Sequence, residues 1–135
     1  MRMRYAAALS VVVAAGLPPG ATSPGTALAQ AANKSAVSFK EDVLPIFQVH
    51  CAACHAAGGA GTAASGLDLT GYPGVMKGTK FGPMVIAGDP DSSNLMRLLD
   101  WKAGAQLRMP HDKQQLPVGE RDTIRTWIRQ GAKDN

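Results

Sequence analysis

The 135-residue sequence lacks the marks of several large protein classes. It has only seven aromatic residues and two cysteines, no run of basic residues and no apolar stretch near the roughly 20 residues that span a bilayer. Without a basic run, a pI of 9.3 is a weak reason to expect nucleic-acid binding. No serine–histidine–acid arrangement or phosphate-binding loop is visible, so we expect no enzyme. So few aromatic residues predict a thin core.

The first residues have the pattern of an export signal. Arg2 and Arg4 give a positive start, residues 5–15 are mostly apolar, and Ala27-Leu28-Ala29 has the small-x-small form that signal peptidase accepts. The apolar run, about 11 residues long, is too short for a membrane anchor. We expect a signal peptide over residues 1–29, cleaved after Ala29 or two or three residues later, and Sec-type export to the periplasm.

The mature chain is predicted to hold one domain. Residues 30–37 are expected to be a flexible N-terminal segment, and residues 38–135 to form the domain. Fourteen basic residues less Arg2 and Arg4 leave twelve against ten acidic residues, a net charge of +2. The scattered lysines and arginines therefore indicate solvated surface, and we expect no nucleic-acid partner and no membrane anchor after cleavage.

The pattern of apolar residues predicts an all-α domain. Ser38 and Glu41 form a capping box, and the apolar spacing that follows predicts a helix ending at Cys51, with a kink or limit at Pro45. A second helix is expected to begin at residues 89–92. It carries an apolar stripe of three leucines, Leu95, Leu98 and Leu99.

A third helix is predicted over Val118–Gln130, with Gly131 as its C-cap and one apolar face formed by Ile124, Trp127 and Ile128. The rest is expected to be long loops, at residues 56–65, 67–90 and 103–115, with a short helix at residues 72–77. Loops of this length are suspicious in a compact domain unless they have a function. Wrapping a large flat cofactor would give them one.

Cys51-Ala52-Ala53-Cys54-His55 is the C-x-x-C-H pattern of covalent haem attachment. Two thiols at this spacing can add to the two vinyl groups on one porphyrin edge, and the following imidazole can ligate the iron. A disulfide across two residues would close too small a loop to stabilise the fold much. A thioredoxin-type dithiol needs a βαβ context that is missing, and a zinc site needs further ligands. We therefore predict one haem c on Cys51 and Cys54, with His55 as proximal ligand.

The residues alone leave several candidates for the ligand on the distal face of the haem. Met109 is favoured because Pro110 forces it into an extended conformation, which suits a loop presenting a side chain to a flat cofactor. His111 is the alternative, and His50 is a weaker one. Met96 is expected to fill the core. The remaining methionines, Met76 and Met84, lie in the predicted loop segment of residues 67–90 and remain candidates for the distal ligand. A methionine raises the reduction potential relative to a second imidazole.

Three further loop residues, Trp101, Lys102 and Arg108, could donate hydrogen bonds to the haem propionates or could simply be solvated.

Several motifs together resemble planctomycete-type cytochrome c domains, which are related to class I c-type cytochromes. They are the haem motif, S-G-L-D-L at 65–69, G-D-P-D-S-S-N-L at 88–95, R-M-P at 108–110, and W-I with G-A at 127–132. The resemblance spans nearly all of residues 38–132. It implies a cytochrome c-like fold of three or more helices wrapped around one haem, with the terminal helices crossing beside it. It also implies His55 and Met109 as axial ligands, although His111 stands where the family usually has a second proline.

These observations predict a single-electron carrier, not an enzyme, although it could be the cytochrome subunit of one. We expect transient redox partners, a dehydrogenase or an oxidase. The alternative is a haem-based sensor or peroxidase-like protein whose distal site is open or labile.

Overall fold

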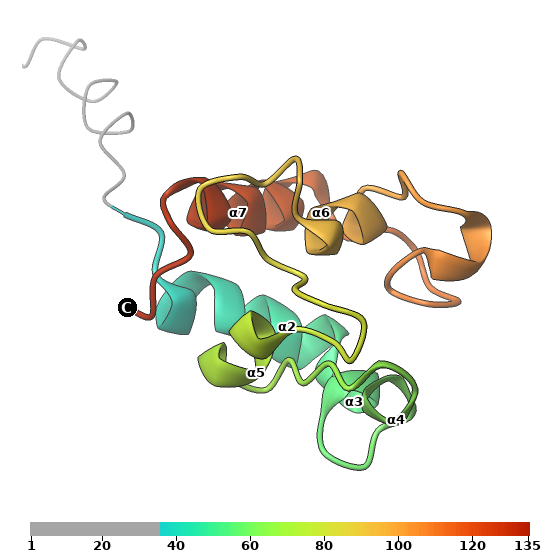
Figure 1. Ribbon diagram of the computed structural model, residues 1–135. Helices are drawn as coiled ribbons and strands as arrows, with labels where there is room; N and C mark the ends of the chain where they lie inside the picture. The colour runs from blue at the N-terminus through green and yellow to red at the C-terminus, as the bar shows by residue number, and fades with distance from the viewer. Residues whose placement is uncertain (1–35) are drawn as a thin grey trace, which may run out of the picture. The chain divides into compact units, whose positions relative to one another are not determined.

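A computed structural model of the chain describes residues 36–135 (Figure 1). The predicted signal peptide and most of the predicted flexible segment lie outside the described residues. Within residues 36–135 the chain is helical and has no strand, only an isolated bridge between Thr79 and Gly82, which confirms the all-α prediction. The elements are η1 (Phe39–Val43), α2 (Leu44–His50), α3 (Ala52–His55), α4 (Ala60–Ser65), α5 (Tyr72–Lys77), α6 (Asn94–Leu99), η2 (Ala105–Leu107) and α7 (Val118–Arg129).

The first helix begins at Ser38, as predicted. The Ser38 hydroxyl accepts a hydrogen bond from the Glu41 N–H at 3.1 Å, but Asp42, not Glu41, accepts the return bond from the Ser38 N–H, at 2.9 Å. The first turn, η1, is π-helical, and Pro45 follows in the first turn of α2, where its missing N–H is tolerated. The Cys51 N–H closes α2 on the Phe47 carbonyl at 2.9 Å.

The prediction of a loop over residues 56–65 is wrong. Residues 60–65 form α4, because its three alanines favour a helix even though none of its residues is buried. The short helix expected at residues 72–77 is confirmed as α5.

Helix α6 begins later than predicted. The Asp89 carboxylate accepts hydrogen bonds from the N–H groups of Asp91 and Ser92, at 3.1 and 3.0 Å, so it forms a turn before the helix. Ser93 is the N-cap and is fully buried. Met96 is 1% exposed, which confirms its predicted place in the core.

Helix α7 matches its prediction to within one residue, and its three predicted apolar residues are all buried. It ends in a Schellman motif, in which the Gly131 N–H bonds to the Ile128 carbonyl and the Ala132 N–H to the Trp127 carbonyl, both at 2.9 Å. Gly131 has a φ of +100°, a conformation that glycine adopts without steric cost.

The two ends of the described chain meet in an aromatic cluster. The Phe39 ring lies 5.3 Å from both Tyr72 and Trp127, centroid to centroid, and 6.5 Å from Phe47. The contact of Phe39 with Trp127 joins η1 to α7. Elsewhere, α6 packs on α7 and α3 on α4 (Figure 1).

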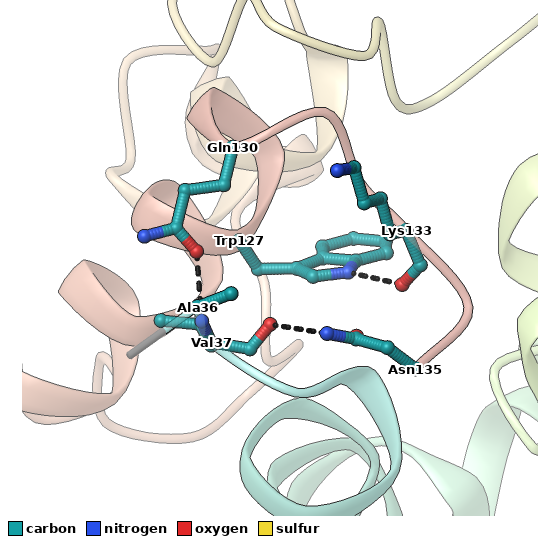
Figure 2. A pocket seen from close by; sticks show the side chains of 6 residues that line it. All are labelled: Ala36, Val37, Trp127, Gln130, Lys133 and Asn135. Atoms are coloured by element: carbon teal, nitrogen blue, oxygen red, sulfur yellow. Dashed lines mark hydrogen bonds between the residues drawn. The ribbon is translucent and has the colours of Figure 1, made fainter. Parts of the chain in front are cut away.

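A pocket of about 340 Å³ lies beside this cluster (Figure 2). Figure 2 shows hydrogen bonds around it from the Val37 N–H to Gln130, 2.7 Å, and from the Trp127 indole to the Lys133 carbonyl, 2.9 Å. Its lining residues are Ala36, Val37, Trp127, Gln130, Lys133 and Asn135. None of them is a predicted haem residue.

Within residues 36–135, no helix combines the length and the apolar character needed to cross a membrane.

Candidate haem site

The haem-attachment motif forms a single helical turn. Cys51 ends α2 and caps α3, and its carbonyl accepts hydrogen bonds from the N–H groups of Cys54, 3.1 Å, and His55, 2.9 Å. Positions i, i+3 and i+4 lie on one face of a helix, so this turn directs both cysteines and the histidine to the same side. Both thiols are free, that of Cys54 is exposed and that of Cys51 is half-buried.

The His55 imidazole is held in one orientation. His55 is 9% exposed, and its Nδ1 lies 3.2 Å from the Leu67 carbonyl oxygen. Because a carbonyl only accepts hydrogen bonds, Nδ1 is the donor, and in the neutral ring this tautomer leaves the lone pair on Nε2, the form that ligates a metal. The Leu69 N–H bonds back to the His55 carbonyl at 2.9 Å, so residues 67–69 fix both the ring and the backbone.

Helix α4 lies directly against this imidazole because residue 61 is a glycine. A Cβ at Gly61 would stand 2.8 Å from both Cε1 and Nε2 of His55, closer than real Cβ contacts allow. A Cβ at Gly59 would likewise stand 2.3 Å from the Cys54 carbonyl oxygen. Gly61 therefore places the α4 backbone, with no side chain of its own, against the Cε1–Nε2 edge of the ring, and Gly59 lets the chain pass close to the Cys54 carbonyl. Together, an Nε2 that makes no hydrogen bond to any described residue and two free thiols within the same helical turn fit a covalently attached haem.

The pKa of the Cys51 thiol disfavours a redox-active dithiol. Burial raises the pKa of Cys51 from 9.0 to about 11, and the acidic Glu120 and Cys54 add to the shift against the opposing effect of Lys113. Reactive dithiols of the thioredoxin type depend on a lowered pKa. Within residues 36–135, no three His, Cys, Asp or Glu side chains are grouped to hold a metal ion.

His50 faces α7. Its Nε2 lies 3.0 Å from Glu120 Oε2 in α7, an ion pair when the imidazole is protonated.

Met109 lies in the loop between η2 and α7. It is half-buried and packs against the core, its N–H bonds to the Leu98 carbonyl at 3.3 Å, and its carbonyl accepts a bond from the Trp101 indole at 3.0 Å. Figure 1 shows this loop and α3 on the same side of the described residues.

The other candidate ligands differ from Met109 in their surroundings. The His111 side chain is 55% exposed, with Nε2 3.6 Å from Asp112. Met84 and Met96 are buried in the core, and Met76 is half-buried against it. No contact in the structure joins Met109 or His111 to His55, so the choice between the two stays a prediction.

The three candidate propionate donors have partners within the protein. The single indole N–H of Trp101 is used by Met109, the Arg108 guanidinium lies 5.1 Å from the centre of the Trp101 ring, and Lys102 Nζ lies 3.5 Å from Asp100. In this conformation Trp101 has no donor left for a propionate.

The contacts of Gly61 and Leu67 with His55 were not predicted from the sequence. A glycine six residues after the haem histidine was a visible signal for Gly61, but it was assigned to a loop. Leu67 acts through its carbonyl, so its side chain gave no signal.

A comparison with protein families confirms the resemblance. The model of the family described as planctomycete cytochrome C matches residues 51–112, from Cys51 through Met109 and His111. The match is shorter than the span of residues 38–132 predicted from motifs. No curated protein and no solved structure matches the chain.

Proposed function

We propose that this chain, which contains a domain of the planctomycete cytochrome c family, is a monohaem c-type cytochrome that carries single electrons in the periplasm. One observation carries the proposal. Cys51, Cys54 and His55 fall within a single helical turn, at positions i, i+3 and i+4, and the hydrogen bond of His55 Nδ1 to the Leu67 carbonyl leaves Nε2 without a hydrogen bond to any described residue.

Each residue has a distinct part in holding the cofactor. The sulfurs of Cys51 and Cys54 would hold the porphyrin as thioethers, and His55 and Met109 would supply the two protein ligands of the iron. When bound, haem supplies an iron that alternates between ferric and ferrous states. The Leu67 carbonyl orients the imidazole and makes it more basic, while a thioether at Met109 favours the ferrous state. With His55 and Met109 both bound, the site would leave small substrates no place on the metal.

The position of Cys54 supports electron exchange with other proteins. Its thiol is at the surface, so the cofactor edge attached there would be accessible from outside. We expect transient partners, a dehydrogenase or an oxidase of a respiratory chain, that dock through a small interface.

Mass spectrometry tests haem attachment. The full chain is produced in a host with working haem-ligation machinery and purified from the periplasm. We expect a polypeptide cleaved after Ala29 and heavier by one haem, with a pyridine haemochrome spectrum of a thioether-linked porphyrin. The Cys51→Ser, Cys54→Ser double variant should show the bare peptide mass. A bare mass for the natural sequence would refute the proposal.

A matched pair of variants tests the distal ligand. Met109→Ala should abolish the weak far-red absorption of methionine-ligated ferric iron and lower the potential, whereas His111→Ala should change neither. The opposite result would assign the ligand to His111.

The exposure of the Met109 loop supports a second candidate, a haem protein with a labile distal site. Within this loop, residues 111–114 are all exposed. Rapid carbon monoxide binding by the unaltered ferrous protein would favour this sensor or peroxidase-like function over electron transfer.

A further inference from the structure

Helix α6 ends in the same motif as α7 but with tryptophan in the place of glycine. The Trp101 N–H bonds to the Leu98 carbonyl at 3.2 Å and the Lys102 N–H to the Arg97 carbonyl at 2.9 Å, the two bonds of a Schellman motif. Trp101 occupies the left-handed position with a φ of +58°, which Gly131 occupies after α7. A bulky residue is rare in this conformation, because its Cβ comes too close to the neighbouring carbonyl oxygen.

The residue before Trp101 fastens this helix end to α7. The Asp100 carboxylate is 5% exposed and accepts hydrogen bonds from Arg121 at 2.8 Å and from Arg125 at 2.6 Å. The end of α6 is therefore a fixed point, and the left-handed turn at Trp101 determines where the indole goes.

The indole goes to Met109. Its N–H donates to the Met109 carbonyl, and the Met109 N–H bonds to Leu98, so both backbone groups of Met109 are tied to the end of α6. The intervening turn, η2, has no buried residue, so packing contributes little to its position. Arg108 covers the indole through a cation–π contact at 5.1 Å.

We infer that Trp101 is a positioning residue that fixes Met109 to the end of α6 and so determines how firmly the Met109 thioether stays on the haem iron. The inference rests on the proposed function. It explains why a tryptophan stands where glycine would be less strained: glycine has no side chain to reach Met109.

The test compares Trp101→Phe with Tyr72→Phe in the haem-loaded protein. Each variant keeps a ring and removes one hydrogen bond to a backbone carbonyl, at Met109 in one case and at Ala132, 2.9 Å, in the other. Trp101→Phe should raise the share of molecules with Met109 dissociated by about fivefold, the equivalent of one lost hydrogen bond. The readouts are a weaker far-red band and increased carbon monoxide binding. Tyr72→Phe should leave both readouts unchanged.

The variant Trp101→Gly tests whether Trp101 acts by positioning Met109 or through the stability of helix α6. Glycine relieves the left-handed conformation, yet the band should weaken at least as much as in Trp101→Phe. The inference is overturned if Trp101→Phe leaves both the far-red band and carbon monoxide binding unchanged while Met109→Ala loses the band. That result would leave the proposed function intact. If Met109→Ala keeps the band, the ligand assignment fails and the inference fails with it.

Discussion

His55 and Met109, the residues proposed to bind opposite faces of the haem, are supported in different ways. His55 is buried, lies in the motif turn itself, and is enclosed by α4 and the Leu67 carbonyl. Met109 is half-buried on an exposed loop and depends on two backbone hydrogen bonds to the end of α6.

The difference indicates that the contacts of His55 control whether the haem site forms, whereas those of Met109 control how firmly the distal ligand binds. Packing around His55 allows no alternative position, so a change there should prevent the site from forming. Hydrogen bonds at Met109 can open and close without unfolding the domain, so a change there should alter ligation while the haem stays attached.

The largest expected effect is at the His55 side. Gly61→Ala places a methyl group 2.8 Å from the imidazole and 3.0 Å from the Cys54 carbonyl, so the ring or α4 has to move. We expect the haem-loaded fraction to fall about tenfold, measured by mass spectrometry of the purified chain.

The matched control is Gly119→Ala in α7, where a Cβ meets nothing within 4 Å. It should load haem normally and stabilise the helix by about 0.5–1 kcal/mol. Normal haem loading in Gly61→Ala would show that packing against His55 is not decisive.

A smaller effect is expected where α6 is fastened to α7. Asp100→Asn leaves Arg121 and Arg125 without their carboxylate, so we expect a loss of about 2 kcal/mol in the free energy of unfolding in urea, together with a weaker far-red band. Asp91→Asn is the control, because Asp91 is 82% exposed and lies 3.7 Å from Arg125. It should change stability by less than about 0.5 kcal/mol. Equal effects of the two variants would contradict the prediction.

The smallest effect is a pH dependence at the same carboxylate. Burial tends to raise the pKa of Asp100, but hydrogen bonds from Arg125 and Arg121 outweigh it and hold the pKa below its ordinary value. The unfolded chain therefore binds this proton at a higher pH than the folded one. Its stabilisation is complete above the ordinary aspartate pKa of about 4 and is lost as pH falls through the lowered value.

The stability difference between the natural protein and Asp100→Asn should accordingly shrink as the pH falls below about 4. Urea unfolding at a series of acidic pH values measures it. A constant difference would show that the Asp100 charge is not what stabilises the contact.

The parts predictable from sequence are those set by local spacing. The C-x-x-C-H motif spans one helical turn, so its geometry follows from its length. Helix α7 was predictable because Ile124, Trp127 and Ile128 repeat at helical intervals and are all buried.

The parts that escaped prediction depend on contacts distant in sequence. Helix α4 buries no residue, so it has no apolar period, and the close approach of Gly61 to His55 exists only once the chain has folded. The bond from Trp101 to Met109 requires a left-handed tryptophan. No sequence rule indicates one, because glycine is the usual residue at that position.

The meeting of the two chain ends has a consequence for synthesis. Phe39 packs on Trp127, and Val37 bonds to Gln130, 93 residues later. A nascent polypeptide therefore lacks the surface that covers its first helix until residues 127–135 have left the ribosome. We expect the core to close late, so that a chain exported as proposed would reach a translocation channel before its two ends have packed together.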